Sequence, residues 1–158
     1  MAMQKSEELT EVAATLFQQL EDLGIKVWTT GFNVWSNDNN FYTDYLTNPQ
    51  GDTAPYTIDT SVHEAFRKIS EAKKRGDDFY IQYEDGEMLK ETYRQIIRFN
   101  NQELYEKMLE DGFQFPQHQH QYEHFVFGAM VSLMFITYEP IPEAHEIFKR
   151  FGKVFEQT

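Results

Sequence analysis

Three histidines lie close together in the segment from His118 to His124, which reads His-Gln-His-Gln-Tyr-Glu-His. Imidazole nitrogens are common metal ligands, and in an extended strand residues two apart point the same way, so His118, His120, Tyr122 and His124 would share a face. His120 and His124 would then lie roughly 13 Å apart, too far for one ion. Because Pro116 and the glutamines are typical of a loop, we predict a solvated connection here and no metal site.

His124 differs from the other two because it leads into the apolar run Phe125-Val-Phe. A histidine in that position faces either the core or a pocket. The first interpretation is a structural histidine with its hydrogen bonds satisfied, and the second is a ligand contact or a pH switch. The residue types favour the structural role, and both interpretations stay open.

Carboxylates are abundant, and an acid/base pair among them would be the simplest catalytic arrangement. The acidic residues considered are Glu84, Asp85, Glu87, Glu91 and Glu110. Charge clusters of this kind are usually solvated faces, and the sequence has no Gly-rich phosphate loop, Gly-x-Ser-x-Gly elbow or His-Glu-x-x-His helix. We therefore predict no catalytic residues and no enzyme activity for this chain.

Aromatic residues are the other group whose types could form a site, because rings can line a flat apolar pocket. The set is Trp28, Phe32, Trp35, Phe41, Tyr42 and Tyr45. Ordinary core packing is the favoured role for most of them, although Trp and Tyr often keep a polar tip available. Trp28, Phe32 and Tyr80, with His124, are the candidate ligand-binding residues.

Composition limits the classes of partner. The 158 residues carry a formal net charge of −12, and nucleic-acid binding depends on clustered Lys and Arg, so DNA, RNA and anionic membranes are poor partners. The absence of cysteine excludes disulfides and thiolate chemistry. No apolar run of about 18 residues and no signal peptide occur, so we expect a soluble protein, cytoplasmic by default.

The elements that must position these residues follow from hydrophobic periodicity. A helix is expected over 6–23, a hairpin over 25–35 and 41–47, and a third strand over 54–59. The pattern then predicts a helix to about Arg75, a strand over 78–84, a helical stretch over 87–109 interrupted near Asn100 and Asn101, strands over 125–130 and 133–138, and a helix over 143–156.

Apolar residues occupy both parities in 25–35 and again in 125–138, whereas a sheet with one wet face would alternate. The central strands must therefore be covered on both sides. We predict an α+β domain with a central antiparallel sheet of about six strands and helices on both faces. The first and last helices are expected to share one face, and the middle helices are expected to cover the other. Residues 1–158 are expected to form one domain.

Two segments carry a resemblance to a known family. They are Leu16-Phe-Gln-Gln-Leu-Glu-Asp-Leu-Gly-Ile25 and Tyr138-Glu-Pro-Ile-Pro-Glu-Ala-His-Glu-Ile-Phe-Lys-Arg-Phe-Gly-Lys-Val-Phe-Glu-Gln-Thr158. These ends, with the element order between them, resemble GAF-like (profilin-like) sensory domains of bacterial histidine kinases and nucleotide cyclases. The sequence lacks the motif Asn-Lys-x-x-x-Phe-x-x-x-Asp-Glu of the members that bind cyclic nucleotides, and it lacks the cysteine to which other members attach a bilin. Cyclic GMP and a covalent bilin are therefore disfavoured, and the ligand stays unknown.

The resemblance implies a regulatory domain of a two-component or related signal-transduction protein, a fragment of a longer chain whose kinase or cyclase activity resides in other domains. Such a domain binds a small molecule, relays a conformational change through its terminal helices, or does both. The stripe of Ile147, Phe148, Phe151, Val154 and Phe155 suggests a parallel homodimer through those helices. The alternative is a structural dimerisation module with no ligand, its interior filled by its own aromatic rings.

Overall fold

The computed structural model describes residues 6–48, 51–52, 55–112 and 116–156. The elements in chain order are α1 (Ser6–Asp22), β1 (Thr29–Trp35), β2 (Phe41–Asn48), β3 (Gly51–Asp52), β4 (Tyr56–Asp59), α2 (Glu64–Lys74), β5 (Phe79–Asp85), α3 (Gly86–Asn100), α4 (Gln102–Asp111), β6 (His120–Phe127), β7 (Val131–Thr137), a 3-10 turn η1 (Pro142–Ala144) and α5 (His145–Glu156).

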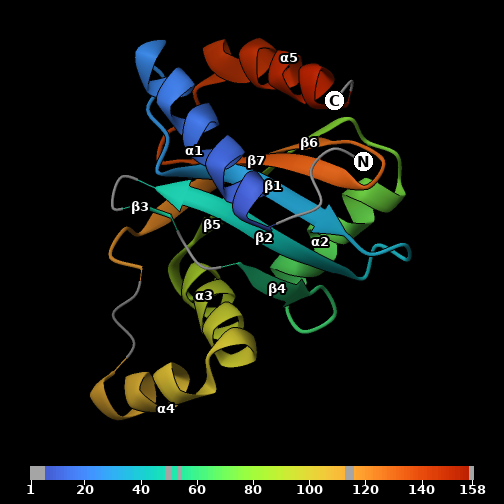
Figure 1. Ribbon diagram of the computed structural model, residues 1–158. Coiled ribbons are helices and arrows are strands. Elements are labelled where there is room, and N and C mark those ends of the chain that lie inside the picture. The colour runs from blue at the N-terminus through green and yellow to red at the C-terminus, as the bar shows by residue number, and fades with distance from the viewer. Residues whose placement is uncertain (1–5, 49–50, 53–54, 113–115, 157–158) are drawn as a thin grey trace.

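The strands form one antiparallel sheet in the order β3-β2-β1-β7-β6-β5, and β4 also pairs with β2. Its middle strands, β1 and β7, come from opposite ends of the chain and pair from Thr29 opposite Ile136 to Val34 opposite Val131. Hairpins join β1 to β2 and β6 to β7, whereas α3 and α4 connect β5 to β6. The pairing of β1 with β7 therefore joins, at the centre of the sheet, strands from the N-terminal and C-terminal parts of the chain (Figure 1).

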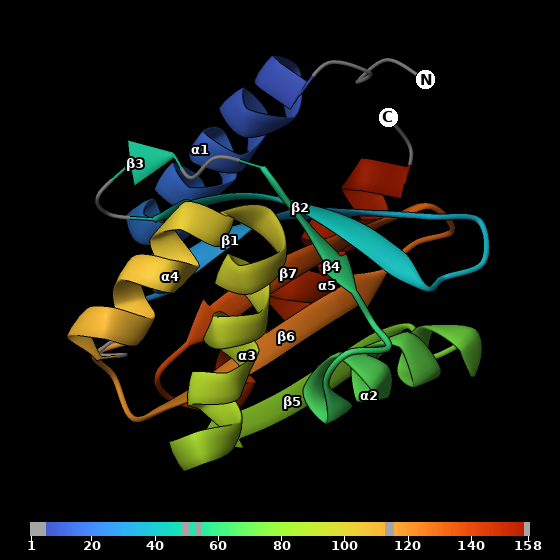
Figure 2. The ribbon, with the colours of Figure 1, turned by 90° about the horizontal axis from the view of Figure 1, so that it is seen from below.

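Helices cover both faces of the sheet, as Figures 1 and 2 show. Alternate residues of β1 make the division clear, because Phe32 belongs to the core under α1 and α5 whereas Trp35 belongs to the core beside α2. The two faces are called here the α1/α5 face and the α3 face. The expected α+β class, the antiparallel sheet and the two-sided cover are confirmed.

The α1/α5 face is packed mainly with apolar side chains. Phe148 of α5 is fully buried and stacks on Phe135 of β7 with ring centroids 4.1 Å apart. Gly152 lets α5 approach the sheet, because a Cβ atom there would lie 2.3 Å from Cγ1 of Val126. Leu16 and Leu20 of α1 complete the same core.

Some boundaries differ from those expected. Strand β6 begins at His120, so much of the segment predicted as a solvated loop is extended backbone hydrogen-bonded to β5. The strand also ends at Phe127, because residues 128–130 form the turn to β7. The predicted interruption is confirmed at Asn101, whose side chain accepts a hydrogen bond from the Leu104 amide and starts α4.

Helix α4 buries none of its side chains and projects from the rest of the domain (Figure 1). Leu104 and Leu109 are among its exposed apolar residues. No helix in the described ranges is both long and apolar enough to cross a membrane.

Candidate functional site

Buried polar side chains gather on the α3 face of the sheet. They are Asn33, Asp44, Gln82, Glu84, Gln121, Glu123 and Ser132 from five strands, with Thr92 of α3. Polar groups cost free energy when they leave water, so a cluster of this size needs internal partners or a ligand. The partners of each group show which of them are satisfied.

A chain of hydrogen bonds crosses three strands and ends at a carboxyl group. Trp35 Nε1 donates to Ser132 Oγ at 2.9 Å, and the Ser132 hydroxyl donates to Asn33 Oδ1 at 2.6 Å. Asn33 Nδ2 then donates to Asp44 Oδ1. The Asn33 side chain therefore accepts one hydrogen bond, from Ser132, and donates another, to Asp44. Together these bonds fix the position of the Asp44 carboxyl.

Burial raises the pKa of Asp44 from 3.8 to about 8, although the hydrogen bond from Asn33 opposes that change. The phenols of Tyr56 and Tyr93 lie near enough to interact electrostatically with Asp44, and burial raises the pKa of both well above 10. Asp44 is therefore a neutral acid at pH 7, in a group that includes two un-ionised phenols.

A second network surrounds Glu84 at the end of β5. Thr92 of α3 donates its hydroxyl to Oε1, and Gln82 Nε2 donates to Oε2 at 3.3 Å. Gln82 also donates to the Ala65 carbonyl oxygen at 3.0 Å, and its own Oε1 accepts from Tyr80 at 2.8 Å. Burial raises the pKa of Glu84, while these hydrogen bonds lower it.

Gln121 connects the buried cluster to the edge of the domain. Its Oε1 accepts from the Tyr93 hydroxyl at 2.9 Å and lies 2.7 Å from His118 Nε2. The Trp28 ring contacts both partners, with centroids 6.1 Å from Tyr93 and 4.6 Å from His118. Burial lowers the pKa of His118, so the ring is mainly neutral at pH 7 with its Nε2 proton directed at Gln121.

Glu123 lies in the middle of the cluster and differs from its neighbours. It pairs with Gln82 of β5 and Ile136 of β7 and is 4% exposed. Its Oε2 has no hydrogen-bond partner among the described residues. The α3 face therefore holds one carboxyl whose partner is missing.

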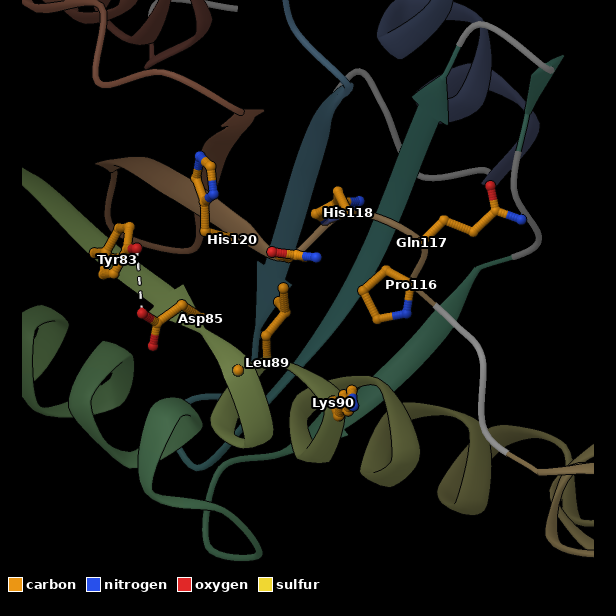
Figure 3. A pocket seen from close by; sticks show the side chains of 10 residues that line it. Tyr83, Asp85, Leu89, Lys90, Pro116, Gln117, His118 and His120 are labelled. Carbon is orange, nitrogen blue, oxygen red and sulfur yellow. Dashed lines mark hydrogen bonds between the residues drawn. The ribbon is translucent and has the colours of Figure 1, made fainter.

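A pocket of about 760 Å³ opens beside the cluster, between the start of α3 and the segment that enters β6. Figure 3 shows Leu89 projecting from α3 and His118 and His120 on the opposite wall. Leu89 and His118 also border the buried cluster, since Leu89 is 1% exposed and His118 contacts Gln121. These two side chains separate the pocket from the interior.

The sheet separates the four ligand-binding residues predicted from the sequence. Trp28 and Tyr80 pack on the α3 face, whereas Phe32 lies in the α1/α5 core. His124 is also on the α1/α5 face, where its ring centroid is 5.3 Å from those of His145 and Phe148. The four residues therefore do not line one site, and Trp28 and Tyr80 are the two that border the polar cluster.

One interpretation of the sequence was wrong in a way that bears on the site. Glu84 was assigned to a solvated face, but it is 1% exposed because α3 packs over the end of β5. Gln82, Gln121 and Glu123 were not singled out at all. Their signal is alternation with aromatic residues in β5 and β6, a pattern that also describes a wet strand face.

The cluster does not have the composition of a metal centre. Among the described residues, no group of three or more His, Cys, Asp or Glu side chains could hold a metal ion. Amide, phenol and carboxyl groups on a common face can instead bind the polar atoms of an organic molecule.

Comparison of the sequence with protein-family models gives no match. Comparisons with curated proteins and with solved structures give no match either. Function must therefore be inferred from the site itself.

Proposed function

We propose that this chain is a sensory domain of a bacterial signal-transduction protein, of the GAF-like type, which binds a small molecule between the sheet and α3. The observation that carries the proposal is the concentration of buried polar side chains on one face of the sheet. A face that served only for stability would be expected to be apolar, as the α1/α5 face mainly is. The GAF-like assignment rests on the resemblance at both ends of the chain and on an antiparallel sheet between helical layers.

Strand β6 offers a direct route from such a ligand to the terminal helices. Glu123 and His124 are consecutive, so their side chains lie on opposite faces of the sheet. His124 contacts His145 and Phe148 of α5. A ligand that shifts β6 at Glu123 would move α5 through His124, provided that it binds the two arrangements with different affinity.

The proposal is tested by screening the purified protein against a library of small metabolites with thermal shift and native mass spectrometry. The matched variant is Gln121→Leu, which removes a polar group of the cluster that contacts both Tyr93 and His118. A compound that stabilises the wild-type protein and fails to stabilise this variant supports the proposal. Failure of every compound, in a protein that also carries no co-purified molecule, would refute it.

The alternative function is a structural dimerisation module without a ligand. Leu23 after α1 and Val154 of α5 favour it, because each is 59% exposed. Sedimentation of the wild-type protein and of a Leu23→Glu, Val154→Glu double variant distinguishes the two. A dimer that the double variant abolishes, in a protein with no ligand response, would support the structural module; a ligand-responsive dimer fits a sensor that signals through its terminal helices.

A further inference from the structure

Glu123 and Glu84 form a natural comparison, because both are buried carboxyl groups on the same face of adjacent strands. Glu84 is 1% exposed and Glu123 is 4% exposed. Each oxygen of Glu84 accepts a hydrogen bond, from Thr92 and from Gln82. Glu123 Oε2 accepts none from the described residues. The domain can therefore satisfy a buried carboxyl at this depth, and it leaves Glu123 unsatisfied.

The sign of the missing partner follows from the charges around it. The buried residues of the described chain include the carboxyls of Asp44, Glu84 and Glu123, but no Lys or Arg side chain. An isolated buried carboxylate is unfavourable unless a cation or hydrogen-bond donors accompany it. A ligand that brings hydrogen-bond donors or a positive charge would therefore stabilise the ionised form of Glu123.

The neighbours of Glu123 indicate an organic cation rather than a metal ion. No set of metal-ligating side chains surrounds it among the described residues. Phe125 follows it on the same face, and the Phe125 ring is 6.5 Å from that of Tyr80. Aromatic faces attract ammonium groups, and two amide side chains flank Glu123: Gln82 lies opposite it on β5, and Gln121 lies two residues before it on the same face of β6.

We propose that the ligand of this domain is a small organic amine whose ammonium group pairs with Glu123, with its apolar part on the Phe125 side. The amine enters from the pocket bounded by Leu89 and His118, and His118 swings away from Gln121 to admit it. This inference rests on the proposed sensory function and specifies its ligand class.

The test is binding of phenethylamine, butylamine and agmatine at up to 10 mM, measured by thermal shift and calorimetry. Phenethyl alcohol and phenylacetate serve as neutral and anionic analogues of the first amine. We expect at least one amine to stabilise the wild-type protein, with the neutral and anionic analogues inactive. Glu123→Gln should weaken amine binding at least tenfold, whereas Glu103→Gln, at an exposed position of α4 outside the cluster, should leave it unchanged.

A second measurement needs no ligand. Glu123→Gln keeps the size of the side chain and replaces a buried carboxyl that has an oxygen without a partner among the described residues, so the ligand-free variant should melt at a temperature no lower than that of the wild type at pH 7. Glu84→Gln, which disturbs satisfied hydrogen bonds, should melt at a lower temperature.

Three results would overturn the inference. They are a lower melting temperature for Glu123→Gln, no response to any of the amines, and amine binding unaffected by Glu123→Gln. If a neutral or anionic compound binds instead, and Gln121→Leu abolishes that binding, the amine class is wrong while the sensory function stands. If nothing binds in this panel or in the metabolite library, both fail.

Discussion

The two faces of the sheet are built from the same strands but have opposite compositions. Under α1 and α5, apolar side chains such as Phe135 and Phe148 fill the core. Under α3, carboxyl and amide groups such as Asp44, Glu84 and Gln121 occupy equally buried positions. One face can supply the stability that lets the other retain groups unfavourable to folding.

The largest expected effect concerns Asp44, on the α3 face. Between the unfolded pKa of 3.8 and the folded value of about 8, the folded protein binds more protons, so stability falls as pH rises. The four-unit difference amounts to on the order of 5 kcal/mol. Asp44→Asn should remove this decline, as measured by urea unfolding from pH 4 to pH 9.

The hydrogen bond from Asn33 can persist to the amide oxygen of Asp44→Asn, which makes this a conservative change. Tyr42, Tyr56, Tyr93 and Glu84 surround the same interior and remain in place. Parallel pH curves for the wild type and the variant would show that Asp44 is not a buried neutral acid.

The second prediction tests the apolar face. Phe148→Ala leaves a cavity against Phe135 in a fully buried position and should lower the free energy of unfolding by about 3–5 kcal/mol. Urea unfolding at pH 7 measures the loss. Gln121→Leu, on the other face, is the comparison and should cost less, about 1–3 kcal/mol, because it keeps the side-chain volume and removes the acceptor of two hydrogen bonds. Equal losses would contradict the division between the faces.

The third prediction concerns His124, which gives the α1/α5 face an opposite dependence on pH. Burial lowers its pKa from 6.5 to about 4, and the charge of His145 adds to that effect. Between those values the unfolded chain binds more protons, so this contribution to stability rises with pH and is lost in acid. His124→Gln should remove about 3 kcal/mol of this rise.

The variant keeps a donor toward Thr137 Oγ1, which lies 3.0 Å from Nε2 of His124. Unfolding midpoints at pH 4 and pH 6.5, compared between the two proteins, measure the difference. An unchanged acid slope would mean that the histidine titrates normally in the folded state.

The smallest effect is expected at Gly152, where α5 meets β6. Alanine favours a helix over glycine by about 1 kcal/mol, but its Cβ would lie 2.3 Å from Val126 Cγ1. We expect Gly152→Ala to destabilise the protein by about 1 kcal/mol net, because α5 must move outward. The Val126→Ala, Gly152→Ala double variant should show positive coupling in a double-mutant cycle, and strict additivity would contradict the contact.

Much of the fold could be predicted from the sequence because its signals are local or depend on periodicity. Apolar residues at both parities correctly indicated strands covered on both sides, as Phe32 and Trp35 show. Asn101 was expected to interrupt a helix, and it does so as an N-cap. These features depend on backbone preference and side-chain direction alone.

The site was less predictable because its burial depends on tertiary packing. Glu84 and Glu123 alternate with aromatic residues, and the same alternation is typical of a strand with one solvated face. That face is buried only because α3 packs over it, as the hydrogen bond from Thr92 to Glu84 shows. Likewise, Tyr80 and His124 are placed on opposite faces by the strand register, in which Tyr80 pairs with Phe125 and Ile81 pairs with His124.

The burial of Glu123 has a consequence for timing. A ligand that reaches it must wait for His118, Leu89 or another part of the wall to move, because the carboxyl group has almost no contact with solvent. Association that requires such an opening is slower than binding to a preformed site, and release is slowed by the same barrier. A domain of this construction would report a concentration averaged over the lifetime of the complex and would not follow brief fluctuations.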